Sequence, residues 1–280
     1  MYNEKLATIF NVRPGEGLRT VLLLIHSFFI GISLIFFETA SYALFLTKFN
    51  VENLPYVYIV SAGIVTVVGF IYSKFQEHLS FSKLLIFTLA FFFLSICTFY
   101  IFLKLVVSEW TAAALVVWYN VMVALVGLEF WGLAGHLLDV RQGKRLYGLI
   151  GVGQIVAEII SGFSVSALAG IIGAAGLLLI SAGGMLSCLV ILIYITHTLS
   201  KQLTPPRDEE DDRSRRSLSE FFKDRYLLLI LFSVAFSIFG YYVLDYIFYE
   251  QVEGYCIGEN QLAGFLGIFA GVNGIINLLC

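Results

Sequence analysis

Long apolar stretches alternate with short polar segments along most of the chain. A helix that crosses a bilayer needs about 20 mainly apolar residues, and eight stretches satisfy this length. The predicted spans are 20–46, 55–73, 84–103, 111–136, 146–169, 171–196, 226–249 and 261–280. They are longer than the roughly ten-residue alternating strands of a membrane barrel. The predicted fold is therefore all-α, as a polytopic membrane protein.

Two polar segments divide the chain into regions. Residues 1–19 mix apolar and charged positions, which predicts a cytoplasmic segment lying partly on the membrane surface. Residues 198–225 are charged and lack apolar periodicity, so they cannot bury enough surface to fold alone. We expect them to form a cytoplasmic linker between a six-helix half, 20–197, and the first two helices of a second, incomplete half, 226–280.

This layout of six helices, a charged inner loop and further helices is typical of major-facilitator transporters, which contain two six-helix halves. The chain stops at Cys280 within an apolar run. That ending predicts either a fragment or a protein that is not a complete transporter of this kind.

Composition and charge support the membrane prediction and give an orientation. Only 13% of the residues are charged, against roughly 25% in soluble domains. If the N-terminus is cytoplasmic, all 17 lysines and arginines except Lys48 and Lys104 fall on the inside. The positive-inside rule therefore predicts a cytoplasmic N-terminus. A bacterial plasma (inner) membrane is the expected location, because the first apolar run is too long and begins too late for a signal peptide.

The glycines of the fifth span suggest helix packing and not a nucleotide-binding loop. A dinucleotide-binding turn must follow a strand and open a soluble helix, whereas these glycines lie between two apolar spans. Gly153, Ala157 and Ser161 are spaced by four, as are Gly162, Ser166 and Gly170. Small residues at this interval let helix backbones approach closely in lipid. The glycine-rich residues 170–176 predict a tight hairpin between the fifth and sixth spans.

Acidic residues within the predicted spans are the candidate functional groups. Glu38, Glu129 and Glu158 lie in the first, fourth and fifth spans, and Gln154 is one turn before Glu158. A single intramembrane acid can be a neutral, hydrogen-bonded structural group. Three of them on polar faces favour a shared hydrated cavity that couples transport to protons or accepts a cationic group. Asp245, nearer the outer end of the seventh span, is a secondary candidate.

A charged segment between the fourth and fifth spans is a candidate cytoplasmic gate. It contains Asp139, Arg141, Lys144 and Arg145. These charges either form a gate that opens and closes during alternating access, or only fix the orientation of the protein. A gate needs an acidic partner, and the candidates are Glu220 and Asp224.

Other residue types give little indication of a metal, cofactor or catalytic site. No lysine or arginine is central in a predicted span, which disfavours an anionic substrate unless helices outside this chain supply bases. The four cysteines and four histidines are scattered without ligand spacing, so we expect no metal or cofactor. Enzyme motifs such as HExxH and GxSxG are missing from the sequence, which makes a membrane enzyme a poor hypothesis.

Several stretches resemble the nucleotide (ATP/ADP) translocase family of plastids and intracellular bacteria. EFWGLAGHLLDVRQGKRLYGLIGVGQ, residues 129–154, is similar to that family's junction between the fourth and fifth helices. NVRPGEG, ALFLTKF followed by LPYVYIVSA, and IFGYYVLDYIF are similar to its broader bacterial members. The resemblance implies a major-facilitator fold and exchange of ATP for ADP or proton-linked nucleotide uptake.

The predicted function is secondary transport by alternating access. The expected partners are membrane lipid and a small solute, which under the resemblance is a nucleotide with a proton or phosphate; nucleic acid is not expected. Two alternatives stay open. One is a proton-coupled transporter of a solute other than a nucleotide, and the other is a transport-silent membrane scaffold or anchor for a regulatory domain.

Overall fold

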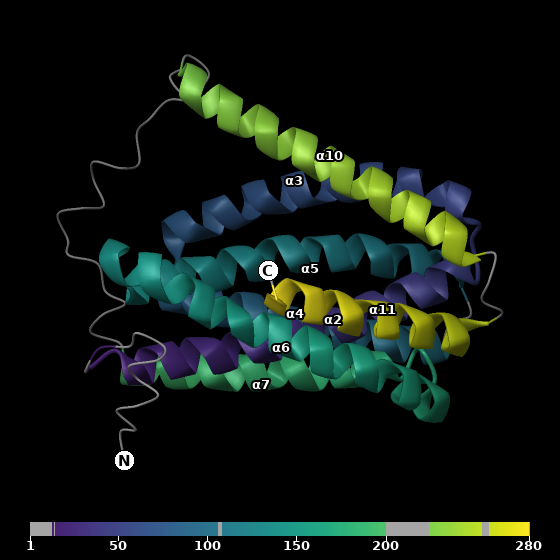
Figure 1. Cartoon of the computed structure of the whole chain (residues 1–280), viewed down its shortest axis with the longest axis horizontal. Helices are drawn as coiled ribbons and strands as arrows, with labels where there is room; N and C mark the ends of the chain where they lie inside the picture. Colours follow the sequence, from purple (N-terminus) through teal and green to yellow (C-terminus); the bar gives the residue numbers. More distant parts are fainter. Residues whose placement is uncertain (1–12, 14, 106–107, 200–223, 254–257, 280) are drawn as a thin grey trace.

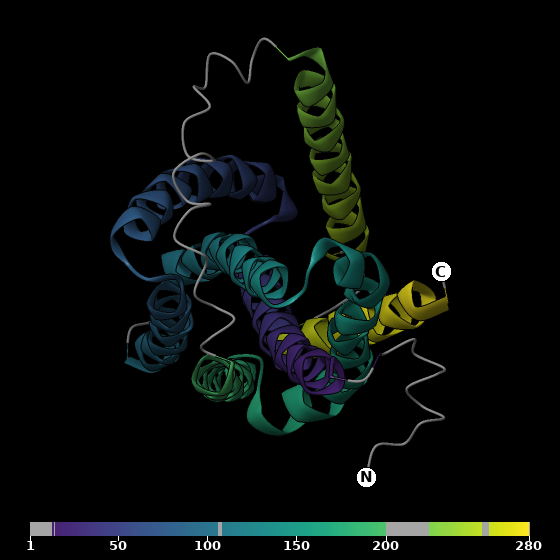
Figure 2. The same ribbon diagram turned by 90° about the vertical axis from the view of Figure 1, so that its left-hand side faces the viewer.

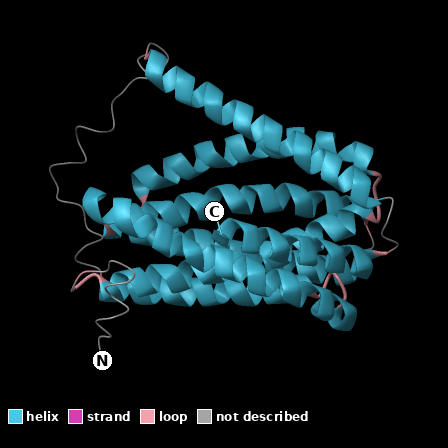
Figure 3. Cartoon of the chain, in the orientation of Figure 1, coloured by secondary structure: helices cyan, strands magenta, loops and turns pink. Residues whose placement is uncertain are grey.

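The computed structural model describes residues 13, 15–105, 108–199, 224–253 and 258–279. This part of the chain is helical and contains no strand (Figure 3). Most of the predicted surface segment, 1–19, and of the linker, 198–225, lies outside the described residues, as does the candidate gate partner at 220. The long helices are α2 (Gly17–Leu46), α3 (Leu54–His78), α4 (Phe81–Leu105), α5 (Glu109–Leu137), α6 (Val140–Ile172), α7 (Leu177–Thr198), α10 (Arg225–Glu253) and α11 (Glu259–Leu279).

All eight are long and apolar enough to cross a membrane, which confirms the predicted fold class. A short 3-10 helix, η1 (Val51–Asn53), precedes α3. Helices suit a bilayer because each one satisfies its backbone hydrogen bonds internally. The predicted spans are correct in number and order, and most of the observed helices extend beyond them by several residues.

The charged segment between the fourth and fifth predicted spans is largely helical, because α6 begins at Val140 and not near 146. Asp139 is the N-cap of α6, and its carboxylate accepts a hydrogen bond from the backbone N–H of Gln142 at 2.8 Å. The Gln142 side chain in turn accepts from the backbone N–H of Asp139 at 3.1 Å. This reciprocal capping box starts the helix at Val140. Arg141, Lys144 and Arg145 therefore lie on the first turns of α6.

The connection from α6 to α7 is short, but the two helices do not form a packed pair. Gly173 turns the chain with a φ of 75°, and α7 begins at Leu177. The predicted hairpin is wrong in its packing, since α6 and α7 make little contact with each other and each packs along α2. Two serines join α2 and α7, where the Ser181 hydroxyl donates to the Ser33 carbonyl at 2.7 Å.

Helix α2 is the centre of the bundle and contacts α5, α6, α7 and α11 (Figures 1 and 2). Its contact with α6 is close because small residues face each other. A Cβ placed on Gly153 would lie 2.3 Å from the Leu24 carbonyl oxygen, and one on Gly31 would lie 2.7 Å from Ala157 Cβ. The four-residue spacing of Gly153, Ala157 and Ser161 thus marks a buried packing face, as predicted.

The last two helices are placed very differently. Helix α11 packs along α6, where a Cβ on Gly162 would lie 2.4 Å from the Gly271 nitrogen and 2.6 Å from the Gly267 carbonyl oxygen. Gly170 has open space around it and takes no part in this contact. Helix α10 tilts away from the other helices and approaches them toward its end (Figures 1 and 2). Most of its side chains are exposed.

Candidate functional site

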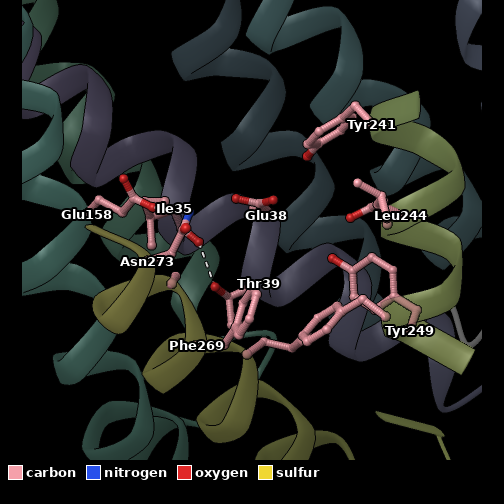
Figure 4. A pocket seen from close by; sticks show the side chains of 13 residues that line it. Ile35, Glu38, Thr39, Glu158, Tyr241, Leu244, Tyr249, Phe269 and Asn273 are labelled. Carbon is pink, nitrogen blue, oxygen red and sulfur yellow. Dashed lines mark hydrogen bonds between the residues drawn. The ribbon is translucent and has the colours of Figure 1, made fainter. Parts of the chain in front are cut away.

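A cavity of about 400 Å³ lies between α2 and α6 on one side and α10 and α11 on the other (Figure 4). It is therefore formed jointly by helices from both sides of the charged segment 200–223. The lining residues are Ile35, Glu38, Thr39, Glu158, Tyr241, Leu244, Asp245, Phe248, Tyr249, Leu266, Phe269, Ala270 and Asn273.

Three carboxylates from three different helices meet in this cavity. Glu38 comes from α2, Glu158 from α6 and Asp245 from α10, and each side chain is only partly buried. Glu38 interacts electrostatically with both of the others. Carboxylates that share a partly enclosed apolar site can exchange protons or bind a cationic group.

Polar side chains orient two of the three carboxylates. The Tyr58 hydroxyl of α3 donates a hydrogen bond to Asp245 at 2.5 Å. The Asn273 amide of α11 donates to Glu158 at 3.2 Å. These bonds connect helices on the two sides of the cavity, because α3 and α6 precede the segment 200–223 and α10 and α11 follow it.

Aromatic rings cover one wall of the cavity and extend behind it. Tyr249 of α10 stacks on Tyr42 of α2 with ring centroids 4.5 Å apart, and Tyr242 lies against Tyr58 at 4.6 Å. The Tyr242 hydroxyl donates to the Asn120 side chain at 2.9 Å. Tyrosines present an apolar face and a polar tip, so this wall suits a flat or cationic group beside the carboxylates.

The structure does not bring Glu129 to this cavity, which corrects the predicted grouping. Glu129 is fully buried and pairs with His26 of α2, whose Nε2 lies 3.1 and 3.2 Å from the two carboxylate oxygens. Cys188 of α7 packs against the same ring, with its sulfur 3.3 Å from Nδ1. Glu129 faces the bundle core because α2 occupies that side of α5. It joins three helices there and does not reach the cavity.

Three further positions differ from the sequence prediction. Gln154 is exposed and does not line the cavity, although it lies one turn from Glu158. Asn273, which the sequence analysis missed, does line it. An asparagine within the apolar run of α11 is the signal that would have identified it. Asp245, expected to be secondary, is as central to the cavity as Glu38 and Glu158.

The charged residues at the start of α6 surround a second pocket, at the end of the bundle where α2 begins. Arg145 binds Glu16, with Nη2 at 2.7 and 2.6 Å from the two carboxylate oxygens. The partner of Arg145 is therefore Glu16 of the α2 N-terminus; Asp224 instead accepts from the backbone N–H of Tyr226. Lys144 is exposed and does not line the pocket.

The electrostatics of Glu16 follow from these contacts. Burial acts to raise its pKa, but hydrogen bonds from the Arg13 backbone and from the Arg145 and Gln142 side chains oppose this effect, as does the positive charge of Arg145. The pKa of Glu16 is lowered from its usual 4.5 as a result. Glu16 is thus held as an anion at neutral pH.

Fold and cavity together define an integral membrane protein with a polar, acidic site between two groups of helices. Comparison with known families identifies it further, since residues 103–280 match the model of the TLC ATP/ADP transporter family. The match covers more than half of the chain, which therefore belongs to that family.

Curated relatives agree with this assignment. The chain is 26% identical over 194 residues to ADP,ATP carrier protein 1 of Chlamydia muridarum and 25% identical to the protein of the same name from Chlamydia trachomatis. Each alignment covers 61% of this chain but 36% of the carrier. The chain thus aligns with about a third of the length of these relatives. No solved structure matches it significantly.

Proposed function

We propose that this chain is part of a secondary transporter that works by alternating access and exchanges nucleotides of the ATP/ADP type or takes them up with protons. The cavity carries the proposal, because three carboxylates from separate helices meet there between two groups of helices. Intramembrane acids that face a common cavity are typical of substrate and proton pathways. Membership of the TLC ATP/ADP transporter family supports the nucleotide as the substrate class.

In this proposal Glu38, Glu158 and Asp245 bind a proton or a cationic group. The hydrogen bonds from Asn273 to Glu158 and from Tyr58 to Asp245 fix the two outer carboxylates. Glu38 interacts electrostatically with both of them, and its own hydrogen-bond partner is Tyr119 of α5, which does not line the cavity. Because Tyr58 and Asn273 connect helices on opposite sides, changing the charge of a carboxylate would alter the contacts between these two groups of helices.

The arrangement of the transporter follows the same reasoning. Helices α2–α7 would form one half and α10 and α11 the beginning of a second, as in major-facilitator proteins with a central site between halves. The distribution of lysine and arginine supports a cytoplasmic N-terminus. We also propose that the protein lies in a bacterial inner membrane, as the sequence predicts.

One observation favours a second candidate, a proton-coupled transporter of a solute other than a nucleotide. The described residues that line the cavity include three acids and no lysine or arginine. Nucleotide phosphates are normally held by basic side chains or helix N-termini. In the nucleotide proposal those groups must come from outside this cavity.

Flux through vesicles tests the proposal. Full-length protein is reconstituted into liposomes loaded with ADP, and uptake of labelled ATP is measured with and without a pH gradient. We expect Glu158→Gln and Asp245→Asn each to lower uptake about tenfold or more, as expected when a group on the transport path is lost. Glu250→Gln, an exposed acid at the end of α10, is the control and should keep normal uptake.

The remaining outcomes separate the alternatives. Uptake of another solute that depends on Glu158, without ATP or ADP exchange, would support the second candidate. Vesicles that move no member of a broad solute panel would favour a scaffold without transport activity. Normal exchange in both cavity variants would refute the assignment of the site.

A further inference from the structure

A third pocket, distinct from the acidic cavity and from the charged pocket around Glu16, is lined mainly by aromatic side chains and glycines. It has a volume of about 470 Å³ and lies between α3, the start of α4 and α5. It shares no lining residue with either of the other two pockets. The lining residues that matter here are Tyr72, Gln76, Phe81, Gly127, Trp131 and His136.

The rings of this pocket are held in place by one another and by the backbone. Phe81 and His136 stack with ring centroids 3.8 Å apart and an angle of 18° between the rings. Nδ1 of His136 lies 2.9 Å from the Gly132 carbonyl oxygen, which orients the imidazole. Trp131 is 51% exposed, so much of its indole surface is uncovered. The pocket therefore presents ordered flat surfaces to whatever enters it.

The polar character of the pocket comes from a neutral amide. Among the described residues that line it there is no aspartate, glutamate, lysine or arginine. The amide of Gln76 offers both a hydrogen-bond donor and an acceptor. Flat rings beside such an amide match a planar heteroaromatic ring, which stacks through its face and forms hydrogen bonds through its edge. A lipid chain would use the apolar surfaces but not the amide.

One face of α6 connects this pocket with the acidic cavity. Four residues share that face because they are spaced by three and four positions, namely Tyr147, Gly151, Gln154 and Glu158. Trp131 packs edge-to-face against Tyr147, with ring centroids 5.6 Å apart. With a rise of 1.5 Å per residue, Tyr147 lies about 16 Å from Glu158 along α6. A ring bound at Trp131 is thus beside the face of α6 that leads to the cavity.

We propose that this pocket binds a planar heteroaromatic ring of the size of a purine, stacked on Trp131 and hydrogen-bonded by the Gln76 amide. The volume of about 470 Å³ is within the range of about 300–1,000 Å³ that is usual for small-molecule sites. A role in transport, as a position that the base of a nucleotide occupies on its way to the acidic cavity, rests on the proposed function. The binding itself does not.

Binding of adenosine to the purified full-length protein in nanodiscs tests this site without a transport step. Adenosine carries the ring but no phosphate, and ribose is the comparison ligand that lacks the ring. Each labelled ligand is titrated, and the bound amount is measured by equilibrium dialysis. We expect saturable binding of adenosine and no saturable binding of ribose.

Gly127→Leu should weaken adenosine binding about tenfold or more, because the leucine fills space that the stacked ring needs. A Cβ on Gly127 meets no atom within 4 Å, so the variant is compatible with folding. Gly135→Leu is the matched control, since Gly135 lies on the same helix, has equally open surroundings and does not line the pocket.

A second pair of variants removes the stacking surface instead of filling the pocket. Trp131→Ala should also weaken binding about tenfold or more. Trp110→Ala is its control, because Trp110 is an exposed ring at the start of α5 and lies outside the pocket. The melting temperature of each variant shows that it is folded.

Two results would overturn the proposal: no saturable adenosine binding by the unmodified protein, or equal binding by Gly127→Leu and Gly135→Leu. The vesicle flux assay separates this outcome from the fate of the transport proposal. Exchange of ATP for ADP without adenosine binding would remove the pocket and leave transport standing. Adenosine binding that is lost in Gly127→Leu, in a protein that moves no solute, would establish the pocket and refute transport.

Discussion

Replacing Glu129 with alanine tests whether this residue is structural, as its surroundings indicate. Glu129 and His26 are both fully buried and lie 3.1 Å apart. Removing one member of a buried pair leaves the other without a partner, which costs about 3–5 kcal/mol of stability. We therefore expect Glu129→Ala to lower the free energy of unfolding by about this amount.

Glu129→Gln gives a graded comparison because it keeps a hydrogen-bonding group next to the imidazole. Its expected cost is smaller, about 1–3 kcal/mol. Glu109→Ala is the control, since Glu109 lies exposed in the first turn of the same helix. Unfolding of the full-length protein in mixed micelles, titrated with a denaturing detergent, measures all three variants.

A particular combination of results would refute this reasoning. If Glu129→Ala unfolds like the Glu109→Ala control yet abolishes solute flux, Glu129 belongs to the transport route as the sequence suggested. If Glu129→Ala is less stable but each folded molecule still transports solute, Glu129 is structural. It then acts with His26 and Cys188 to connect α2, α5 and α7.

Two further predictions concern helix packing and pH. Gly162→Ala should destabilise the protein by about 1–3 kcal/mol, because the new Cβ would lie 2.4 Å from a backbone nitrogen of α11. Gly170→Ala is the control and should leave the stability unchanged, because the space around Gly170 is open. Equal melting temperatures of the two variants would contradict the predicted contact between α6 and α11. The lowered pKa of Glu16 means that its contribution to stability is present above 4.5 and lost as the pH falls through the folded-state pKa. The melting difference between the native protein and Glu16→Gln should thus shrink on acidification, and a constant difference would contradict the ion pair.

The hydropathy of the sequence predicts where the helices lie in the chain, but it does not predict which helices pack against each other. Apolar length determines what crosses a bilayer, so all eight spans were found. The early start of α6 depends on hydrogen bonds between Asp139 and Gln142, which an apolar window does not detect. The hairpin of α6 and α7 was mispredicted because a short glycine-rich connection limits distance but does not decide which helix each one packs against.

The candidate site was predicted only in part, since hydropathy cannot tell which side of a helix faces a cavity. Glu38 and Glu158 lie in one cavity, as expected, but Glu129 turns toward His26, and the exposed Gln154 does not take part. Asp245 seemed peripheral because its position along α10 says nothing about how that helix leans against α3. These differences come from contacts between residues more than 100 positions apart, such as Tyr58 and Asp245.

The pairing of His26 with Glu129 also has a consequence for biosynthesis. The two residues are 103 positions apart, and at about 5–20 residues per second the ribosome needs roughly 5–20 seconds to make the chain between them. During this time α2, the first helix to emerge, carries an imidazole whose final partner does not yet exist. The nascent α2 therefore gains this buried hydrogen bond only after α5 has been made, so the packing around His26 is completed later than the synthesis of α2.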